Sequence, residues 1–148
     1  MQNMRVSAIL AALAAVVAAG SSSVTGTVTY GERIALPADA MIIIRIWDVT
    51  RRDDWQMIGK QVLTNAGQPP VRFKVEYNLD RVRPDGDYVV EARILVGSQL
   101  RWINTAGCPV ITKGYPAAVS VVVRPFTVGA QSVALTSRPI PDCRYDRR

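Results

Sequence analysis

The sequence predicts an all-β protein, a single β-sandwich of about seven or eight short, mostly antiparallel strands that follow an N-terminal signal helix. Apolar and polar residues alternate with a period of two along most of the chain after residue 20, which is the period of a half-buried strand. Stretches rich in Gly, Pro, Asn and Asp separate these runs at short intervals. At 148 residues, 49% of them hydrophobic and 20% charged, the chain is large enough for one hydrophobic core.

The beginning of the chain has the features of a secretory signal. Arg5 supplies a positive charge, and the apolar run VSAILAALAAVVAA at 6–19 is followed by small residues. This run is shorter than the ~20 residues that a membrane-spanning helix needs, so cleavage is favoured over a membrane anchor and no stable membrane span is expected. Export would place the mature chain in an oxidising compartment, most simply the periplasm. The predicted organisation is a signal peptide over 1–20, a β-sandwich domain over 21–126 and an extended C-terminal tail over 127–148.

Three runs show the strand alternation most clearly. In VRFKVEY, at 71–77, every second residue is apolar and the residues between are charged. YVVEARILV, at 88–96, repeats the pattern, and in VTGTVTY, at 24–30, threonines alternate with apolar residues. Gly26 in the last run is expected to mark a bulge or a close crossing. Further strands are expected at 41–49, 56–64, 99–105 and 118–126.

The predicted sandwich is of the immunoglobulin or transthyretin type, and two aromatic residues are interpreted within it. Tyr88 directly follows the turn RPDGD at 83–87, as in a tyrosine corner, although ordinary core packing explains its position equally well. LRWINTAGCP, at 100–109, is interpreted as an amphipathic strand with Trp102 in the core. A small recognition surface is the alternative for this stretch.

The strand MIIIRIWDV at 41–49 has apolar residues on both faces. Its inner row is predicted to be Ile42, Ile44 and Ile46, and its outer row Met41, Ile43, Arg45, Trp47 and Val49. This outer row is too apolar for a freely solvated sheet face. A neighbouring loop, the C-terminal tail or a partner protein could cover it. Ile43 and Trp47, together with Trp55, are therefore the candidate partner surface.

Cys108 and Cys143 are the only cysteines, so a single intramolecular pairing exists. In an exported protein a disulfide is favoured, and it would tether the tail SRPIPDCRYDRR to the domain. Two free thiols or an intermolecular bridge are the alternatives. Two cysteines without any histidine fall short of a zinc site, so no metal is expected.

The residues indicate no catalysis. Without histidine the usual proton carrier near neutral pH is missing, and no Ser–His or Cys–His pair can form. The close carboxylate pairs, Asp53 with Asp54 and Asp85 with Asp87, lie in expected turns and not across a cleft. No phosphate-binding loop occurs, and the basic residues behind the formal charge of +6 are scattered. No enzymatic activity, cofactor or nucleic-acid partner is therefore expected.

Several stretches of the chain resemble the YscW/YbaY-type envelope lipoprotein domain. VTGTVTYGERIALPADAMIIIRIWDVTR resembles the opening of that domain, and PVRFKVEYN, YVVEARI and LRWINTAGCPVITKG continue the match over roughly residues 23–125. The features that carry the resemblance are GTVTY with ERIALP after it, the following DVTR, and an aromatic residue, Asn and Pro-Val at Trp102, Asn104, Pro109 and Val110.

The resemblance implies a β-sandwich without enzymatic activity. Some members are pilotin-like lipoproteins that help a secretin to reach or assemble in the outer membrane for type III secretion. Family lipoproteins carry a cysteine for acylation at the cleavage site, whereas this region reads VVAAGSSSV here. The resemblance with this departure favours a free periplasmic protein over a lipid-anchored one.

The predicted function is that of a non-catalytic periplasmic protein that binds a cell-envelope protein or assists its assembly. An outer-membrane secretin-like assembly is the candidate partner. The alternative is a carbohydrate- or peptidoglycan-binding module, in which an exposed Trp47 or Trp55 would stack on a sugar ring.

Overall fold

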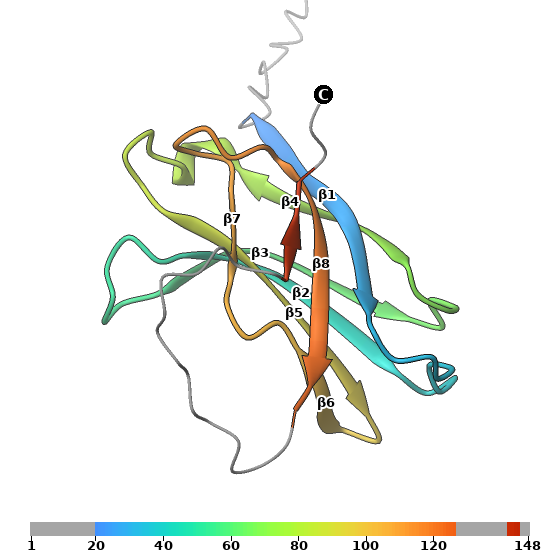
Figure 1. Cartoon of the computed structure of the whole chain (residues 1–148). Helices are drawn as coiled ribbons and strands as arrows, with labels where there is room; N and C mark the ends of the chain where they lie inside the picture. Colours follow the sequence, from blue (N-terminus) through green and yellow to red (C-terminus); the bar gives the residue numbers. More distant parts are fainter. Residues whose placement is uncertain (1–19, 127–141, 146–148) are drawn as a thin grey trace, which may run out of the picture.

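The computed structural model of the protein describes residues 20–126 and 142–145. The elements in this part of the chain are β1 (Ser21–Tyr30), β2 (Met41–Asp48), β3 (Gln56–Thr64), β4 (Val71–Asn78), the 3-10 turn η1 (Leu79–Arg81), β5 (Tyr88–Val96), β6 (Gln99–Ile103), β7 (Cys108–Val110), β8 (Ala118–Pro125) and β9 (Cys143–Arg144). The all-β class predicted from the sequence is confirmed (Figure 1). The predicted signal peptide lies outside the described residues.

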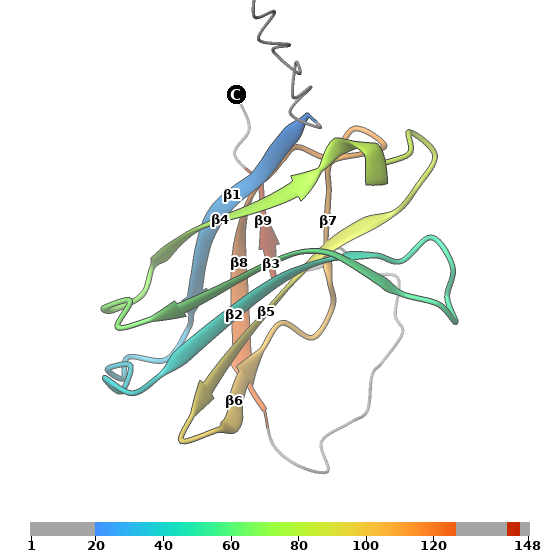
Figure 2. The same cartoon turned by 180° about the vertical axis from the view of Figure 1, so that it is seen from behind.

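The strands form one continuous sheet in the order β3-β2-β5-β6-β8-β1-β4, with β7 paired to β5 and β9 paired to β8. Neighbours are antiparallel except β1 and β8, which run parallel, so the sheet is mixed. A sandwich would have two separate layers, but here β6 and β8 join the two halves through the pairs Trp102–Pro125 and Ile103–Arg124. The predicted sandwich is therefore corrected to a single sheet that curls nearly into a barrel (Figures 1 and 2).

The two edge strands of this sheet, β3 and β4, lie next to each other and nearly close the barrel (Figure 2). Gly59 makes the close approach possible, because a Cβ at this position would lie 2.8 Å from the carbonyl oxygen of Glu76. A side chain also bridges the two edges in place of regular backbone pairing. The amide of Lys74, on β4, donates to Oε1 of Gln61, on β3, at 2.8 Å. The edges are thus covered without regular strand pairing.

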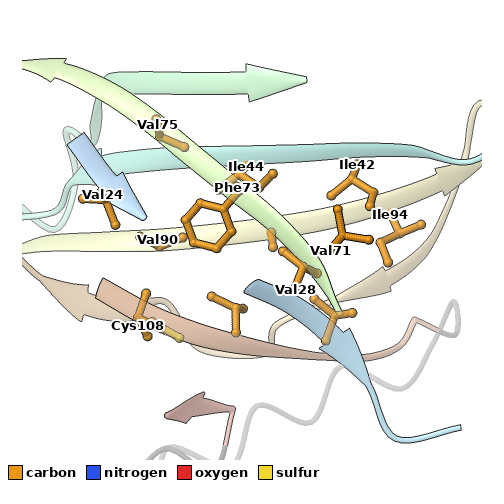
Figure 3. Packing of buried hydrophobic residues seen from close by; sticks show 14 of the residues in the cluster. Val24, Val28, Ile42, Ile44, Val71, Phe73, Val75, Val90, Ile94 and Cys108 are labelled. Atoms are coloured by element: carbon orange, nitrogen blue, oxygen red, sulfur yellow. The ribbon is translucent and has the colours of Figure 1, made fainter. Parts of the chain in front are cut away.

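Alternating residues of the strands fill the interior, as the sequence pattern predicts. Figure 3 shows valines and isoleucines of β1, β2, β4 and β5 converging around Phe73. The predicted inner row of β2 is confirmed, because Ile42, Ile44 and Ile46 are all buried. Trp102 is also buried and stacks on Tyr30 at 5.1 Å between ring centroids, which confirms its interpretation as a core residue.

Gly26 lies where β1 and β8 run side by side. A Cβ on this residue would lie 1.7 Å from the carbonyl oxygen of Val119, far inside any allowed contact. The close crossing expected from the sequence is therefore confirmed, and its partner is the parallel strand β8.

Tyr88 forms the corner that its sequence position suggested. Its hydroxyl accepts a hydrogen bond from the amide of Arg83 at 2.8 Å and donates to the carbonyl of Arg81 at 3.2 Å. The ring is buried in the core, so this one side chain ties the turn before β5 to the barrel interior.

Residues 142–145, which we call the C-terminal strap, close the wall between β7 and β8. Cys143 forms a disulfide with Cys108 of β7, and β9 pairs with Ser120 and Val121 of β8. The amide of Val122 also donates to the carbonyl of Asp142 at 2.7 Å. The intramolecular disulfide is thus formed as predicted, while residues 127–141 of the predicted tail lie outside the described part of the chain.

The side chain of Asp142 anchors the strap to the barrel wall. It is fully buried, and its carboxylate accepts hydrogen bonds from Arg124 Nε at 2.7 Å and from the hydroxyl of Thr105 at 2.8 Å. The hydrogen bond with Asp142 and its negative charge raise the pKa of Arg124, which keeps the guanidinium charged. Tyr145 adds a further contact, because its hydroxyl donates to the carbonyl of Pro109 at 2.6 Å.

Candidate binding face

The outward-facing residues of β3, β2 and β5 form one continuous surface, which we call the outer face. The strand register sets its rows, because residues paired across neighbouring strands point to the same side of a sheet. The rows are Thr64–Met41–Leu95, Val62–Ile43–Arg93, Lys60–Arg45–Glu91 and Met57–Trp47–Val89. Trp55, just before β3, adjoins the last row through its contact with Trp47.

Exposed apolar side chains gather on this face. Seven large hydrophobic residues are exposed in the described part of the chain, and four of them, Met41, Trp55, Met57 and Val62, lie on or beside the outer face at 38–53% exposure. The other three are spread over separate loops and η1. Gathered exposed apolar side chains are a common feature of binding surfaces, so this face is the candidate site.

Charged residues cross the middle of the outer face, and we call Lys60, Arg45, Glu91 and Arg93 the charged belt. Glu91 is shared by two guanidinium groups, since Arg45 contacts it and Arg93 Nε lies 3.0 Å from its Oε1. The guanidinium of Arg45 also lies 4.9 Å from the ring centroid of Trp47, in a cation–π contact. The belt is thus an ordered set of charges with apolar residues on both sides.

The residues predicted as a partner surface all lie on or beside the outer face. Trp47 and Trp55 come together, with ring centroids 6.3 Å apart and planes tilted by 51°. Ile43 is separated from them by the belt, four residues before Trp47 on the same face of β2. Trp47 and Ile43 are half-buried, whereas Trp55 is exposed. Trp55, from the neighbouring loop, therefore provides part of the cover that the sequence required for Trp47.

Other members of the face were not identified from the sequence. Met57, Lys60 and Val62 lie on β3, whose burial alternates weakly because the strand is at an edge of the sheet. The signal that could have found them is the register of the β2–β3 hairpin, which places Val62 opposite Ile43.

The surface also has two shallow depressions, one of about 270 Å³ near Leu36 and Gln68 and one of about 260 Å³ near Val89 and Tyr115. The polar side chains lining the first are Asn65 and Gln68, and the amide of Gln68 already bonds both the N–H and the carbonyl of Leu36. In the second, Lys113 is paired with Asp87 at 2.7 Å. Neither depression brings together an unpaired acid, base and nucleophile that could carry out a reaction.

The described residues offer neither a metal site nor a membrane-spanning helix. Among residues 20–126 and 142–145, no group of three His, Cys, Asp or Glu side chains is arranged to hold a metal ion. Within the same ranges, no helix has the length and apolar character needed to cross a bilayer.

The sequence of the chain matches a known protein family. The model of the Type III secretion system lipoprotein chaperone family (YscW) matches residues 19–123. The chain belongs to the YscW family. The match includes all of the outer face, while the C-terminal strap lies beyond it.

Two relatives support the family assignment. The chain is 31% identical over 94 residues to the uncharacterized lipoprotein YbaY of Escherichia coli (strain K12). The aligned stretch covers 62% of this chain and 50% of YbaY. The chain thus spans about half the length of this curated relative. A solved structure of an alternative pilotin from the type II secretion system of Vibrio cholerae is 33% identical, with a TM-score of 0.70 over 73% of this chain and 99% of the pilotin. YscW-family membership and the pilotin likeness agree with a cell-envelope protein of a typically non-catalytic class.

Proposed function

We propose that this YscW-family protein is a non-catalytic assembly factor of the cell envelope, and that it binds another envelope protein through the outer face. The observation that carries the proposal is the gathering of exposed Met41, Trp55, Met57 and Val62 around an ordered charged belt. Binding needs only a complementary surface of this kind.

A secretin is the proposed client. The family description is that of a secretion-system lipoprotein chaperone, and the similar solved structure is a pilotin of a secretion system. The family model and the solved structure both describe proteins of secretion systems. This chain shares the fold of the pilotin over most of its described length.

The alternative function, carbohydrate binding, receives less support from the geometry. A sugar-binding platform needs flat, open aromatic faces, but the guanidinium of Arg45 lies over Trp47 and the ring of Trp55 is tilted against it. Trp55 is the exposed member of this pair.

The proposal also concerns location. The predicted signal peptide and the disulfide suit a periplasmic protein, and the outer face would then meet clients on their way to the outer membrane. Osmotic-shock fractionation of the host cell should release the mature chain with periplasmic markers. Recovery with the membrane pellet after a high-salt wash would contradict a free periplasmic form.

The client is tested by deleting the gene in the host cell and measuring detergent-resistant secretin multimers in the outer membrane. We expect the multimers to fall strongly and to return with the wild-type chain. The variant Met41→Ser with Val62→Ser should fail to restore them, because it removes apolar contact area from the outer face. Ile34→Ser is the matched control, since Ile34 is 55% exposed but lies in the connection between β1 and β2, outside the outer face. Unchanged multimers in the deletion strain would exclude a secretin as the client.

A further inference from the structure

We propose that the outer face recognises a peptide segment in which an acidic side chain stands between two apolar ones. This inference rests on the proposed function and adds the chemistry of the segment that is bound. It follows from three features of the face: two separate apolar zones, the spacing between them, and the excess of positive charge in the belt.

The belt divides the apolar surface into two zones. The first zone consists of Met41, Ile43, Val62 and Leu95, and the second of Trp47, Trp55, Met57 and Val89. Each zone contains two exposed large side chains, Met41 and Val62 in the first and Trp55 and Met57 in the second. A partner that contacts both zones must therefore pass over the belt.

The spacing of the zones sets the spacing within the partner segment. Ile43 and Trp47 are four residues apart on β2, which corresponds to about 13 Å along a strand. A helix covers about this distance between residues i and i+7 or i+8, and it places residues i+3 and i+4 between them on the same face. A helical segment would therefore present apolar side chains two turns apart and a polar one in the turn between.

The charges of the belt select an acidic side chain for this middle position. The belt has three cationic groups and one carboxylate, so it carries an excess of two positive charges. Glu91 is already engaged by both arginines and has a side chain only 16% exposed. Lys60 is exposed and has no ion-pair partner within the described ranges, and the side chain of Arg93 is 37% exposed. An incoming carboxylate would gain charge-assisted hydrogen bonds from these two groups, whereas a lysine would be repelled.

The same charges argue against a second copy of the chain as the occupant. Two outer faces brought together around a twofold axis would place one excess of positive charge against another. A lipid surface is also a poorer fit. Inserting both apolar zones into a bilayer would carry the belt between them toward the hydrocarbon, where charged groups are costly.

The test is selection of random peptides displayed on phage against the purified mature chain, in low and in moderate salt. We expect enrichment of peptides with Asp or Glu between two large apolar residues, and about tenfold weaker binding of the best peptide to Lys60→Glu. Lys60→Glu with Arg93→Gln should instead enrich peptides with a basic or neutral residue at that position. Lys60→Glu alone keeps the test valid if the double variant does not fold, because Lys60 makes no ion pair in the described part of the chain.

Arg144→Glu is the matched control, because it makes the same change of charge on an exposed residue of β9, which pairs with β8 and lies outside the outer face. It should leave the selected peptide and its affinity unchanged. Enrichment of peptides without an acid, or of the same peptides by wild type and by the charge variants, would overturn the proposal. Binding to phosphatidylglycerol vesicles, with a blue shift of tryptophan emission that Lys60→Glu removes, would overturn it in favour of a membrane surface.

The outcomes of this test and of the secretin test are distinguishable. Selected acidic peptides without any effect on secretin multimers would retain the binding chemistry and exclude the client. Loss of multimers in the deletion strain together with selection of uncharged peptides would retain the client and exclude the acidic segment.

Discussion

At the scale of single residues, this barrel depends on a few positions where backbones approach more closely than a side chain would allow. Gly26 and Gly59 both face a carbonyl oxygen of another strand at a distance that a Cβ cannot accept. Gly31 has open space around it, which makes it a useful comparison. The first two glycines are therefore required by packing and not by turn formation.

We predict that Gly26→Ala destabilises the fold by about 3 kcal/mol, because the methyl group would force β1 away from Val119 of β8. Equilibrium unfolding in urea measures the change. Gly31→Ala is the control and should alter the unfolding free energy by less than about 0.5 kcal/mol. A change of that small size in Gly26→Ala would contradict the close approach of the two strands.

Tyr145 gives the strap a predicted dependence on alkaline pH. Burial, with a smaller contribution from Tyr115, raises the pKa of Tyr145 from 10.0 to about 12. Since the folded-state pKa is the higher one, its contribution to docking is complete below about pH 10 and is lost as the pH rises through about 12. Ionisation also removes the proton that Tyr145 donates to Pro109. The tyrosinate absorbance of wild type minus Tyr145→Phe should show a midpoint near pH 12, and a midpoint near 10 would contradict the burial.

At the scale of elements, the sequence predicted strands well and their pairing poorly. The alternation in β4 and β5 correctly identified which residues are buried, because each of these strands has one face on the core. Alternation is the same whichever way a neighbour runs, so it contains no sign that β1 and β8 are parallel. The joining of two layers into one sheet depends on two residue pairs between β6 and β8, which no pattern of hydrophobicity could reveal.

In the outer face, too, the residues that depend on the pattern of one strand were predicted, and those that depend on strand pairing were not. The apolar outer row of β2 identified Ile43 and Trp47, because three consecutive isoleucines and a tryptophan leave apolar residues on both faces. Lys60 and Val62 require the register of β3 against β2, and Glu91 requires that of β5. Asp142 could not be found either, since its role depends on Thr105 and Arg124 being brought to it by the fold.

The strap is an element whose docking can be followed at one amide. Val122 donates its amide hydrogen to Asp142, so exchange of this hydrogen reports opening of the strap. We predict that Asp142→Asn speeds this exchange roughly 30-fold, equivalent to about 2 kcal/mol, because the carboxylate loses its charge-assisted bonds to Arg124 and Thr105. The amide of Thr25, which donates to Ala117, is the internal control. Equal acceleration of both amides would mean that the substitution loosens the whole barrel.

At the scale of the whole molecule, the disulfide holds the end of the described chain to its middle. Cys108 and Cys143 are separated by 35 residues, and closing a loop of this length stabilises a fold by about 3–4 kcal/mol on the chain-entropy model. We predict that Cys108→Ala with Cys143→Ala lowers the unfolding free energy by about this amount, and that reductant no longer affects this variant. Urea titrations with and without reductant measure both effects. A loss below about 1 kcal/mol would show that the packing of the strap, and not the covalent link, keeps the wall closed.

The position of β1 determines when the barrel can be completed. β1 is the first described strand, yet its two neighbours are β4 and β8, and its partners on β8 begin at Ala118. During synthesis from the N-terminus, β1 can pair with β4 once residue 78 has emerged, but its other edge stays unpaired until β8 is available. Such long-range pairing slows folding to milliseconds or longer and leaves an unpaired strand edge of the nascent chain open to aggregation.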